Sequence, residues 1–123
     1  MDDKFQGEGK CTTSTGTIYK GYFINYKING QGECIVPNSR TYRGEFVDDE
    51  ACGHGIMTYN SGARFEGEYM NNKKHGIGKF ISKTGITYEG RYHEGKLIEG
   101  KMVSLDGDIY EGTFDEEYAK RRW

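Results

Sequence analysis

Aromatic residues and glycines alternate with other residues in several short segments of the chain. In one of them Tyr42, Gly44 and Phe46 occupy every second position, with Arg43 and Glu45 between them. Alternation with a period of two places one set of side chains on one face and is typical of a half-buried β-strand. Each copy of the pattern is therefore predicted to form a strand. The aromatic-x-Gly-x-aromatic copies are residues 19–23, 42–46, 65–69, 88–92 and 110–114.

A second motif, Gly-x-Gly, follows the aromatic segments and shares their spacing. Successive aromatic segments start 23 residues apart, except for the last interval of 22 residues. About seven loop residues precede the Gly-x-Gly, and the alternation then resumes, as at Gly32, Cys34 and Val36. Two short strands joined by a loop that contains glycine form a β-hairpin. The predicted hairpins are Tyr19–Val36, Tyr42–Tyr59, Phe65–Ser82 and Tyr88–Ser104, with single strands near Gly9–Thr13 and Tyr110–Phe114.

Stacked hairpins of this kind predict an all-β fold, a single-layer twisted antiparallel sheet that resembles a solenoid. Ten strands at about 4.8 Å spacing give a ribbon of roughly 45 Å in which each hairpin contacts only its neighbours. Because Gly67 has no side chain, the rings of Phe65 and Tyr69 on either side of it can lie across bare backbone. The equivalent residues Cys11 and Cys34 lie about 9.6 Å apart, beyond the roughly 7 Å limit for a disulfide, so both thiols should be free.

The repeat resembles the MORN (membrane occupation and recognition nexus) repeat, and the resemblance covers nearly the whole chain. The segment from Phe65 to Gly78 matches the family pattern almost position by position. The chain departs from the pattern at Ser39 and Ile98, which replace glycines, and at Tyr22, where the family usually has an acidic residue. The resemblance implies stacked hairpins that act as scaffolds, dimerisation modules, peptide-binding grooves or appendages of enzymes, near membranes or the cytoskeleton.

The composition excludes several classes of protein. Only 34% of the residues are apolar, which is few for a central core, whereas 14% are aromatic, too many for a disordered chain. A net charge of −2 gives no field that would attract nucleic acid. The chain has no apolar run of the roughly 20 residues that span a membrane, and its acidic start is unlike a signal peptide. With three cysteines and no N-glycosylation motif, we expect a cytoplasmic protein.

The chain shows no residue pattern of a catalytic, metal or cofactor site. His54, His75 and His93 have no partner at ligand spacing. Cys52 precedes a glycine in a predicted loop and is expected to be the most exposed thiol, with no base assigned to it. The Gly-x-Gly motifs lead into no helix, and glutamates such as Glu68 recur with the repeat and are interpreted as solvated surface. We therefore expect no enzymatic activity, no metal and no cofactor.

The aromatic residues of the repeat form the candidate binding site. No segment of the chain predicts a helix long enough to cover a single-layer sheet, so the rings pack either on one another or on a partner. A strip of tyrosines with polar tips suits an extended or helical segment of another protein. The unpaired edge strands could also join a second copy in a homodimer. The predicted groove comprises Tyr19, Phe23, Tyr42, Phe46, Phe65, Tyr69, Tyr88, Tyr92, Tyr110 and Phe114.

Peripheral membrane binding is the alternative function. Two or three basic charges at about 1 kcal/mol each would give only weak attachment to phosphoinositides, and nearby carboxylates oppose it. We therefore rank a protein-interaction scaffold first, with a membrane module or a targeting module of a longer enzyme as the alternatives. The candidate lipid contacts are Lys73, Lys74, Lys120, Arg121 and Arg122.

The end of the chain departs from the repeat. After Phe114 a Gly-x-Gly should follow, but residues 115–123 contain no glycine. Asp115 suits a helix N-cap, and acidic residues followed by basic ones suit the helix dipole. The sequence thus predicts a repeat domain over residues 1–114 and either a short capping helix or a truncated next repeat over residues 115–123.

Overall fold

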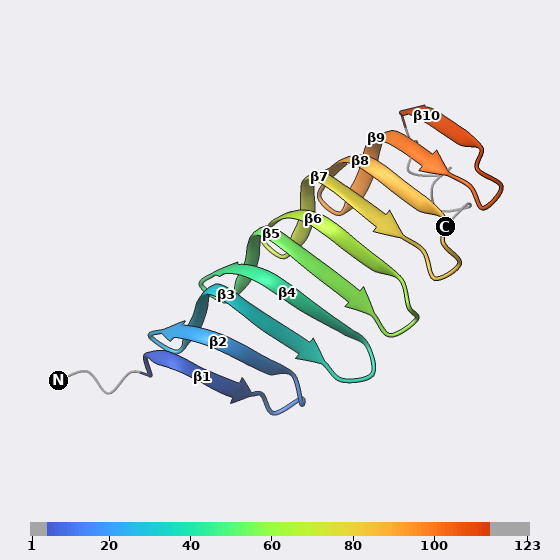
Figure 1. The fold of residues 1–123 in the computed structure, drawn as a ribbon. Coiled ribbons are helices and arrows are strands. Elements are labelled where there is room, and N and C mark those ends of the chain that lie inside the picture. Colours follow the sequence, from blue (N-terminus) through green and yellow to red (C-terminus); the bar gives the residue numbers. More distant parts are fainter. Residues whose placement is uncertain (1–4, 114–123) are drawn as a thin grey trace.

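The computed structural model describes residues 5–113, which form ten β-strands in one open sheet (Figure 1). Each strand pairs antiparallel with the next one along the chain, so the strand order in the sheet is the order in the sequence. The predicted all-β sheet of hairpin repeats is confirmed. The strands are β1 Gly7–Thr12, β2 Ile18–Ile24, β3 Lys27–Val36, β4 Arg40–Val47, β5 Glu50–Tyr59, β6 Arg64–Met70, β7 Lys73–Ile81, β8 Thr87–His93, β9 Lys96–Val103 and β10 Ile109–Thr113.

Each repeat closes with a turn of only two residues, where the sequence predicted a loop of about seven. The prediction was wrong because a β-bulge, such as the one between Gly21 and Tyr22, interrupts the alternation before the turn. The turn residues are mostly polar, and the residues beside them no longer follow the alternation of the strand. In the sequence this whole segment therefore looks like a loop. Two consecutive positive φ values define a type I′ turn, whose twist matches that of the paired strands. The turns are Asn25–Tyr26 (51° and 71°), Asp48–Asp49 (45° and 73°), Asn71–Asn72 (49° and 68°) and Glu94–Gly95 (51° and 89°).

A continuous row of glycines crosses the sheet, one in each strand and each opposite the next. Rings of the inner face, which we define as the face that carries Tyr42 and Phe65, lie on this row. A Cβ added to Gly55 would overlap the ring of Tyr42, and one added to Gly78 would overlap the ring of Phe65. The prediction that rings cover bare backbone is confirmed at these positions. The row consists of Gly9, Gly21, Gly32, Gly44, Gly55, Gly67, Gly78, Gly90, Gly100 and Gly112.

Hydrogen bonds at the turns join each hairpin to the next one. The backbone N–H of Asp49 donates to the carbonyl of Ile28 (3.0 Å), and the N–H of Ile28 donates to Asp49 Oδ1 (2.9 Å). Asn72 makes the same two bonds with Ala51, at 3.0 and 2.8 Å. The backbone pairing of β3 with β4 begins only at Gly30. Before that residue, the bonds at the turns hold the two neighbouring hairpins together.

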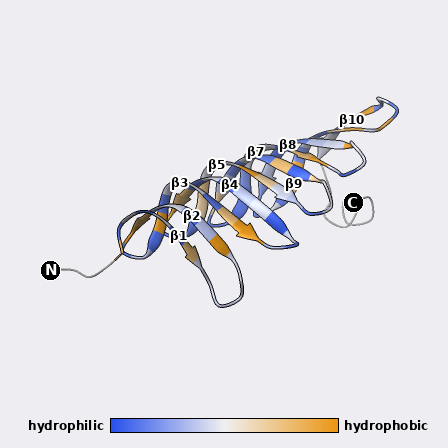
Figure 2. Cartoon of the chain, turned by 60° about the horizontal axis from the view of Figure 1, so that its bottom comes forward, coloured by the Kyte–Doolittle hydropathy of each residue, from blue (hydrophilic) through white to orange (hydrophobic). Residues whose placement is uncertain are grey.

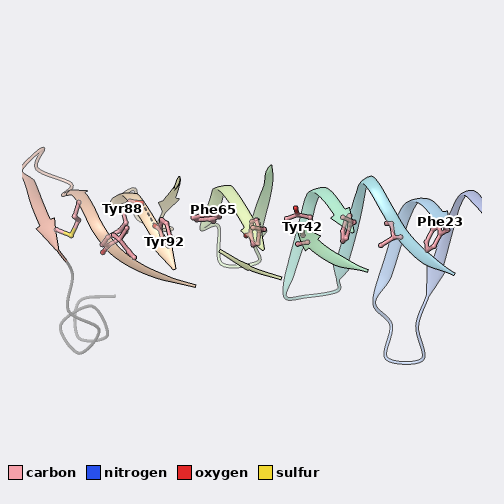
Figure 3. Close-up of a cluster of buried hydrophobic side chains, with 11 residues drawn as sticks. Phe23, Tyr42, Phe65, Tyr88 and Tyr92 are labelled. Carbon is pink, nitrogen blue, oxygen red and sulfur yellow. Dashed lines mark hydrogen bonds between the residues drawn. The ribbon is translucent and has the colours of Figure 1, made fainter. Parts of the chain in front are cut away.

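The hydrophobic core lies along the inner face. Every second residue of the paired strands points to this face, and the outer face carries polar contacts such as the ion pair of Arg43 with Glu33 (2.6 Å). Hydrophobic and hydrophilic segments therefore interleave along the row of strands (Figure 2). Figure 3 shows the core side chains spaced along the strands, with Phe23, Tyr42, Phe65, Tyr88 and Tyr92 labelled.

Several predictions fall beyond β10, the last described element. The groove residue Phe114, the helix or truncated repeat over residues 115–123, and three of the candidate lipid contacts lie outside the described residues. They remain predictions from the sequence.

Candidate functional site

Most rings of the predicted groove are buried against their own chain. Seven of the ten have exposed fractions of 5% or less, so they form the core and offer little surface to a partner. Tyr19 is partly buried beside them, Tyr110 in β10 is 52% exposed, and Phe114 is not among the described residues. Of the two alternatives, packing of the rings on one another therefore accounts for most of the strip. The seven buried rings are Phe23, Tyr42, Phe46, Phe65, Tyr69, Tyr88 and Tyr92.

The buried rings contact one another edge to face across neighbouring hairpins. Tyr42 of one hairpin meets Tyr69 of the next, with ring centroids 5.0 Å apart and planes at 79°. Phe65 meets Tyr92 in the same way, at 5.0 Å and 81°. Within its own hairpin Phe65 also contacts Tyr69 at 5.5 Å. Tyr42, Phe65 and Tyr88 share one cluster, in which Tyr69 contacts both Tyr42 and Phe65. Such contacts add about 0.5–1.5 kcal/mol each beyond burial.

The tyrosine hydroxyls differ in their hydrogen bonding. Tyr42 Oη donates to the carbonyl of Glu45 (3.0 Å), and burial, followed by the charge of Glu45, raises the pKa of Tyr42 to about 12. Tyr92 Oη donates to the carbonyl of Tyr88 (2.9 Å), and burial raises its pKa. Burial also raises the pKa of Tyr69, but its hydroxyl has no hydrogen-bond partner among the described residues. Tyr69 is thus the buried hydroxyl that the fold does not satisfy.

A partly open hollow of about 300 Å³ lies on the inner face between β2 and β6. Tyr42 and Met57, which are cross-strand partners, form its floor. Arg40 also lines the hollow, as do Asp49 and Asn72 of the hairpin turns. An apolar floor with a few polar groups around it is the usual composition of a binding pocket, and the volume is at the lower end of the range for such sites.

The two described lysines of the predicted lipid site do not form a basic patch. Lys74 points to the inner face, where its Nζ lies 5.2 Å from the ring centroid of Phe65, 5.6 Å from that of Tyr59 and 5.7 Å from that of Phe80. Cation–π contacts of this length contribute about 0.5–2 kcal/mol each. Lys73 is exposed and pairs with Glu94 at 3.5 Å. The alternation of side chains could have placed Lys74 on the inner face had the turn been located correctly.

Glu45 and Glu68 do more than solvate the outer face, which the sequence did not reveal. Glu45 Oε2 accepts a hydrogen bond from the backbone N–H of His54 (2.9 Å), and Glu68 Oε1 accepts one from Ile77 (3.0 Å). Both bonds occur where a glycine with positive φ, such as Gly53 at 108°, bends the strand. In both of these repeats an acidic residue stands between the glycine and the second ring of the aromatic pattern. This shared position is the feature of the sequence from which the two hydrogen bonds could have been predicted.

The structure differs from the sequence prediction in the neighbours of two histidines and in the exposure of the cysteines. The rings of His75 and His93 are 5.0 Å apart, so neighbouring strands bring together two histidines that the sequence separates. Cys11 is exposed whereas Cys34 and Cys52 are partly buried, so the prediction that Cys52 is the most exposed thiol was wrong. All three thiols are free, which confirms the prediction for Cys11 and Cys34. In the described part of the chain, no group of three or more His, Cys, Asp and Glu side chains could hold a metal ion.

Comparison with known proteins places the repeat in a family. A family model described as MORN repeat matches residues 1–18, 19–39, 42–64 and 65–87, which together exceed half of the chain. The strands, turns and glycines follow the same arrangement beyond the matched segments, through β8, β9 and β10. The chain matches no curated protein. Residues 5–113 include no helix long and apolar enough to cross a membrane.

Proposed function

The chain belongs to the MORN-repeat family, whose repeats are in general modules for interaction with proteins or membranes, and we propose that it is a non-catalytic scaffold that binds a segment of a partner protein. The segment lies along the inner face, in extended or helical form. The observation that carries this proposal is the partly open hollow on the inner face, which the partly buried Met57 lines together with polar side chains. A cytoplasmic location, near a membrane or the cytoskeleton, is part of the same proposal.

The hollow supports a protein partner because its walls combine apolar and polar groups. Arg40 and Asp49 both line it, so a polypeptide backbone with its own donors and acceptors would find complementary groups there. Interfaces bind most strongly where an apolar anchor enters a pocket and a polar rim excludes water. Within residues 5–113, β1 and β10 are the edge strands of the sheet; they offer a second mode, pairing with another copy, because unpaired strand edges accept further strands.

Membrane binding has weaker support. Of the candidate lipid contacts that the structure describes, Lys74 is engaged with rings on the inner face and Lys73 with Glu94. Each basic residue near an anionic membrane contributes only about 1 kcal/mol, so Lys73 and Lys74 would add little to attachment there. Lys120, Arg121 and Arg122 lie outside the described residues, and a role for them in membrane binding or targeting stays a prediction.

Site-specific photo-crosslinking tests the proposal. Random peptides are selected by phage display against the full chain and then crosslinked through a photoreactive side chain at Met57 on the inner face or at Val47. Val47 is the matched control, because it lies on the outer face and is 54% exposed. We expect crosslinks from position 57 and not from position 47. Crosslinks from position 47 alone, or binding to phosphoinositide liposomes without any selected peptide, would contradict the proposal. Variants of buried rings such as Phe65 are unsuitable because they would disturb the core.

A further inference from the structure

The β-bulge has the same construction in the first three hairpins, β2–β3, β4–β5 and β6–β7. Between the glycine row and the turn, the second strand of each hairpin carries two more residues than the first. The second strand bends there at a glycine with positive φ, which is 78° at Gly30, 108° at Gly53 and 102° at Gly76. The residues that follow these glycines occupy equivalent positions, and they are Gln31, His54 and Ile77.

A glutamate carboxylate occupies the bulge in the second and third hairpins. Glu45 Oε2 accepts a hydrogen bond from the backbone N–H of His54 (2.9 Å), and Glu68 Oε1 accepts one from Ile77 (3.0 Å). A Cβ added to Gly53 would lie 2.9 Å from Glu45 Cδ, so the carboxylate lies directly against the bent backbone. Hydrogen bonds from a backbone N–H to a carboxylate are stronger than those between neutral groups. The bulge of this repeat therefore binds a carboxylate in two of its copies.

The first hairpin has the same bulge without the carboxylate. Tyr22, which is 42% exposed, stands where the other two hairpins have a glutamate. A Cβ added to Gly30 would meet no atom within 4 Å, so Tyr22 does not fill the space that the glutamates fill. Gly30 is exposed, whereas Gly53 and Gly76 are half-buried. The backbone that binds a carboxylate elsewhere in the sheet is thus open in the first hairpin.

The fourth hairpin, β8–β9, has a different bulge. Its second strand carries one extra residue instead of two. Arg91 stands at the position of Tyr22 and pairs with Glu99 (3.2 Å). Of the four hairpins within residues 5–113, the first is therefore the one that combines the carboxylate-binding bulge with an open surface.

We propose that the bulge at Gly30 and Gln31 is a binding site for the carboxylate of a glutamate side chain from another polypeptide. The carboxylate accepts a hydrogen bond from the backbone N–H of Gln31, as Glu45 does from His54 in the next hairpin. The occupant follows from the molecule itself, which places a glutamate side chain in this bulge twice. The site lies on the outer face, so it is a second binding surface that does not depend on the hollow of the inner face.

The acidic neighbour on β4 does not exclude this occupant. Glu45 is the Cα partner of Gln31, but its carboxylate turns to the N–H of His54 on β5. Glu68 stands in the same relation to His54, and the carboxylate of Glu45 nevertheless lies in that bulge. The second hairpin therefore shows that a carboxylate binds here with a glutamate beside it.

Charges of both signs surround the rest of the site. Glu8 on β1 is the Cα partner of Tyr22, and Lys20 lies on the same face of β2. Asp48 Oδ1 accepts a hydrogen bond from the side-chain amide of Asn29 (3.3 Å). Exposed charges of opposite sign offset one another and are screened by salt, so the hydrogen bond to the backbone determines which ligand binds.

Proton–nitrogen NMR of the full chain tests the site, with the α-amide of N-acetyl-glutamate as the probe. We expect the amide proton of Gln31 to move downfield and to saturate as the probe is added. The amide proton of His54, which is already bonded to Glu45, should stay in place. The α-amide of N-acetyl-glutamine has the same size without the charge and should leave both protons where they are. N-acetyl-glutamine with a free main-chain carboxylate is the third probe; a response to it and not to the glutamate probe would overturn the side-chain occupant.

Exchanging the residues of the first two hairpins provides the matched variants. Tyr22→Glu fills the bulge from within, so the amide proton of Gln31 should lie downfield without any probe and should no longer respond to it. Glu45→Tyr is the reverse exchange and should make the amide proton of His54 respond. Tyrosine and glutamate both occur at this position of the repeat, so the hairpin accommodates either of them.

Three results would overturn the proposal. The first is an amide proton of Gln31 that does not move, and the second is one that moves equally with the glutamate and glutamine probes. The third is a response that persists in Tyr22→Glu while His54 in Glu45→Tyr gives none. Crosslinks from position 57 report on the inner face, so the proposed function and this site stand or fall separately.

Discussion

Replacing Gly78 by alanine should destabilise the chain through one ring, that of Phe65. A Cβ at position 78 would overlap two atoms of this ring and lie 3.3 Å from a third. The three nearest atoms all belong to Phe65, so the methyl group fits only if the ring moves. Gly67, its neighbour in the glycine row, provides the contrast. There a Cβ would lie 2.5 Å from Gly78 Cα and 2.7 Å from the carbonyl oxygen of Ile77, both of which are backbone.

The magnitudes follow from these contacts. Phe65 is 0% exposed, and removing a buried phenylalanine side chain costs about 3–5 kcal/mol. Inserting a methyl group into packed surroundings costs about 1–3 kcal/mol. If the ring is the only obstacle, Gly78→Ala adds almost nothing once Phe65→Ala has removed it. The double variant should therefore be about as stable as Phe65→Ala alone, with a coupling energy of about 1–3 kcal/mol.

Urea unfolding of the single and double variants measures this coupling, provided that the slopes with denaturant remain equal. Gly67→Ala is the matched control, because it meets backbone and should keep most of its cost in the Phe65→Ala background. Additive costs for Gly78→Ala and Phe65→Ala would refute the role of the ring as cover for the glycine row.

Four further predictions follow from other parts of the structure. Burial raises the pKa of Tyr42 to about 12 from 10.0, so the contribution of Tyr42 to the free energy of unfolding should be constant below pH 10 and fall between pH 10 and 12; comparing the pH dependence of unfolding in the unchanged chain and in Tyr42→Phe checks this. Burial also raises the pKa of Cys34, so iodoacetamide should label exposed Cys11 first and Cys34 last, as followed by mass spectrometry. Asn72→Gly keeps the positive-φ turn but removes the side-chain hydrogen bond to the preceding hairpin, and should lower the free energy of unfolding by about 1 kcal/mol in urea. Deletion of residues 115–123 should cause self-association or a lower melting temperature if they form the predicted cap; light scattering and a thermal melt would show neither change if they do not.

The repeat could be predicted from the sequence because two motifs recur in phase, and the strands that carry them pair as expected. The sequence also indicated rings over glycine, since Gly67 stands between Phe65 and Tyr69. It did not indicate that the glycines form one row across all ten strands, because the register between Gly55 and Gly67 depends on pairing between hairpins.

Other features could not be predicted because they depend on the bulges and turns. A bulge changes which residues share a face, so Lys74 was placed on the surface although it lies among rings of the core. The hydroxyl of Tyr69 could not be recognised as unsatisfied, because the sequence pattern at Tyr92 is the same and there the hydroxyl has a partner. Local hydrogen bonding, which the pattern does not encode, distinguishes the two.

A single-layer sheet must cover its own inner face, and this requirement determines where the chain can bind a partner. Rings lie over the glycine row in the second and third hairpins, and Ile28, a residue just after a turn, lies over it in the first. At the equivalent position of the fourth hairpin Leu97 is buried, whereas Ala51 lines the hollow. The repeat alone therefore does not make a binding site. Since the fold tolerates residues of different size at this position, a single substitution there can open or close the inner face while the stacked hairpins stay the same.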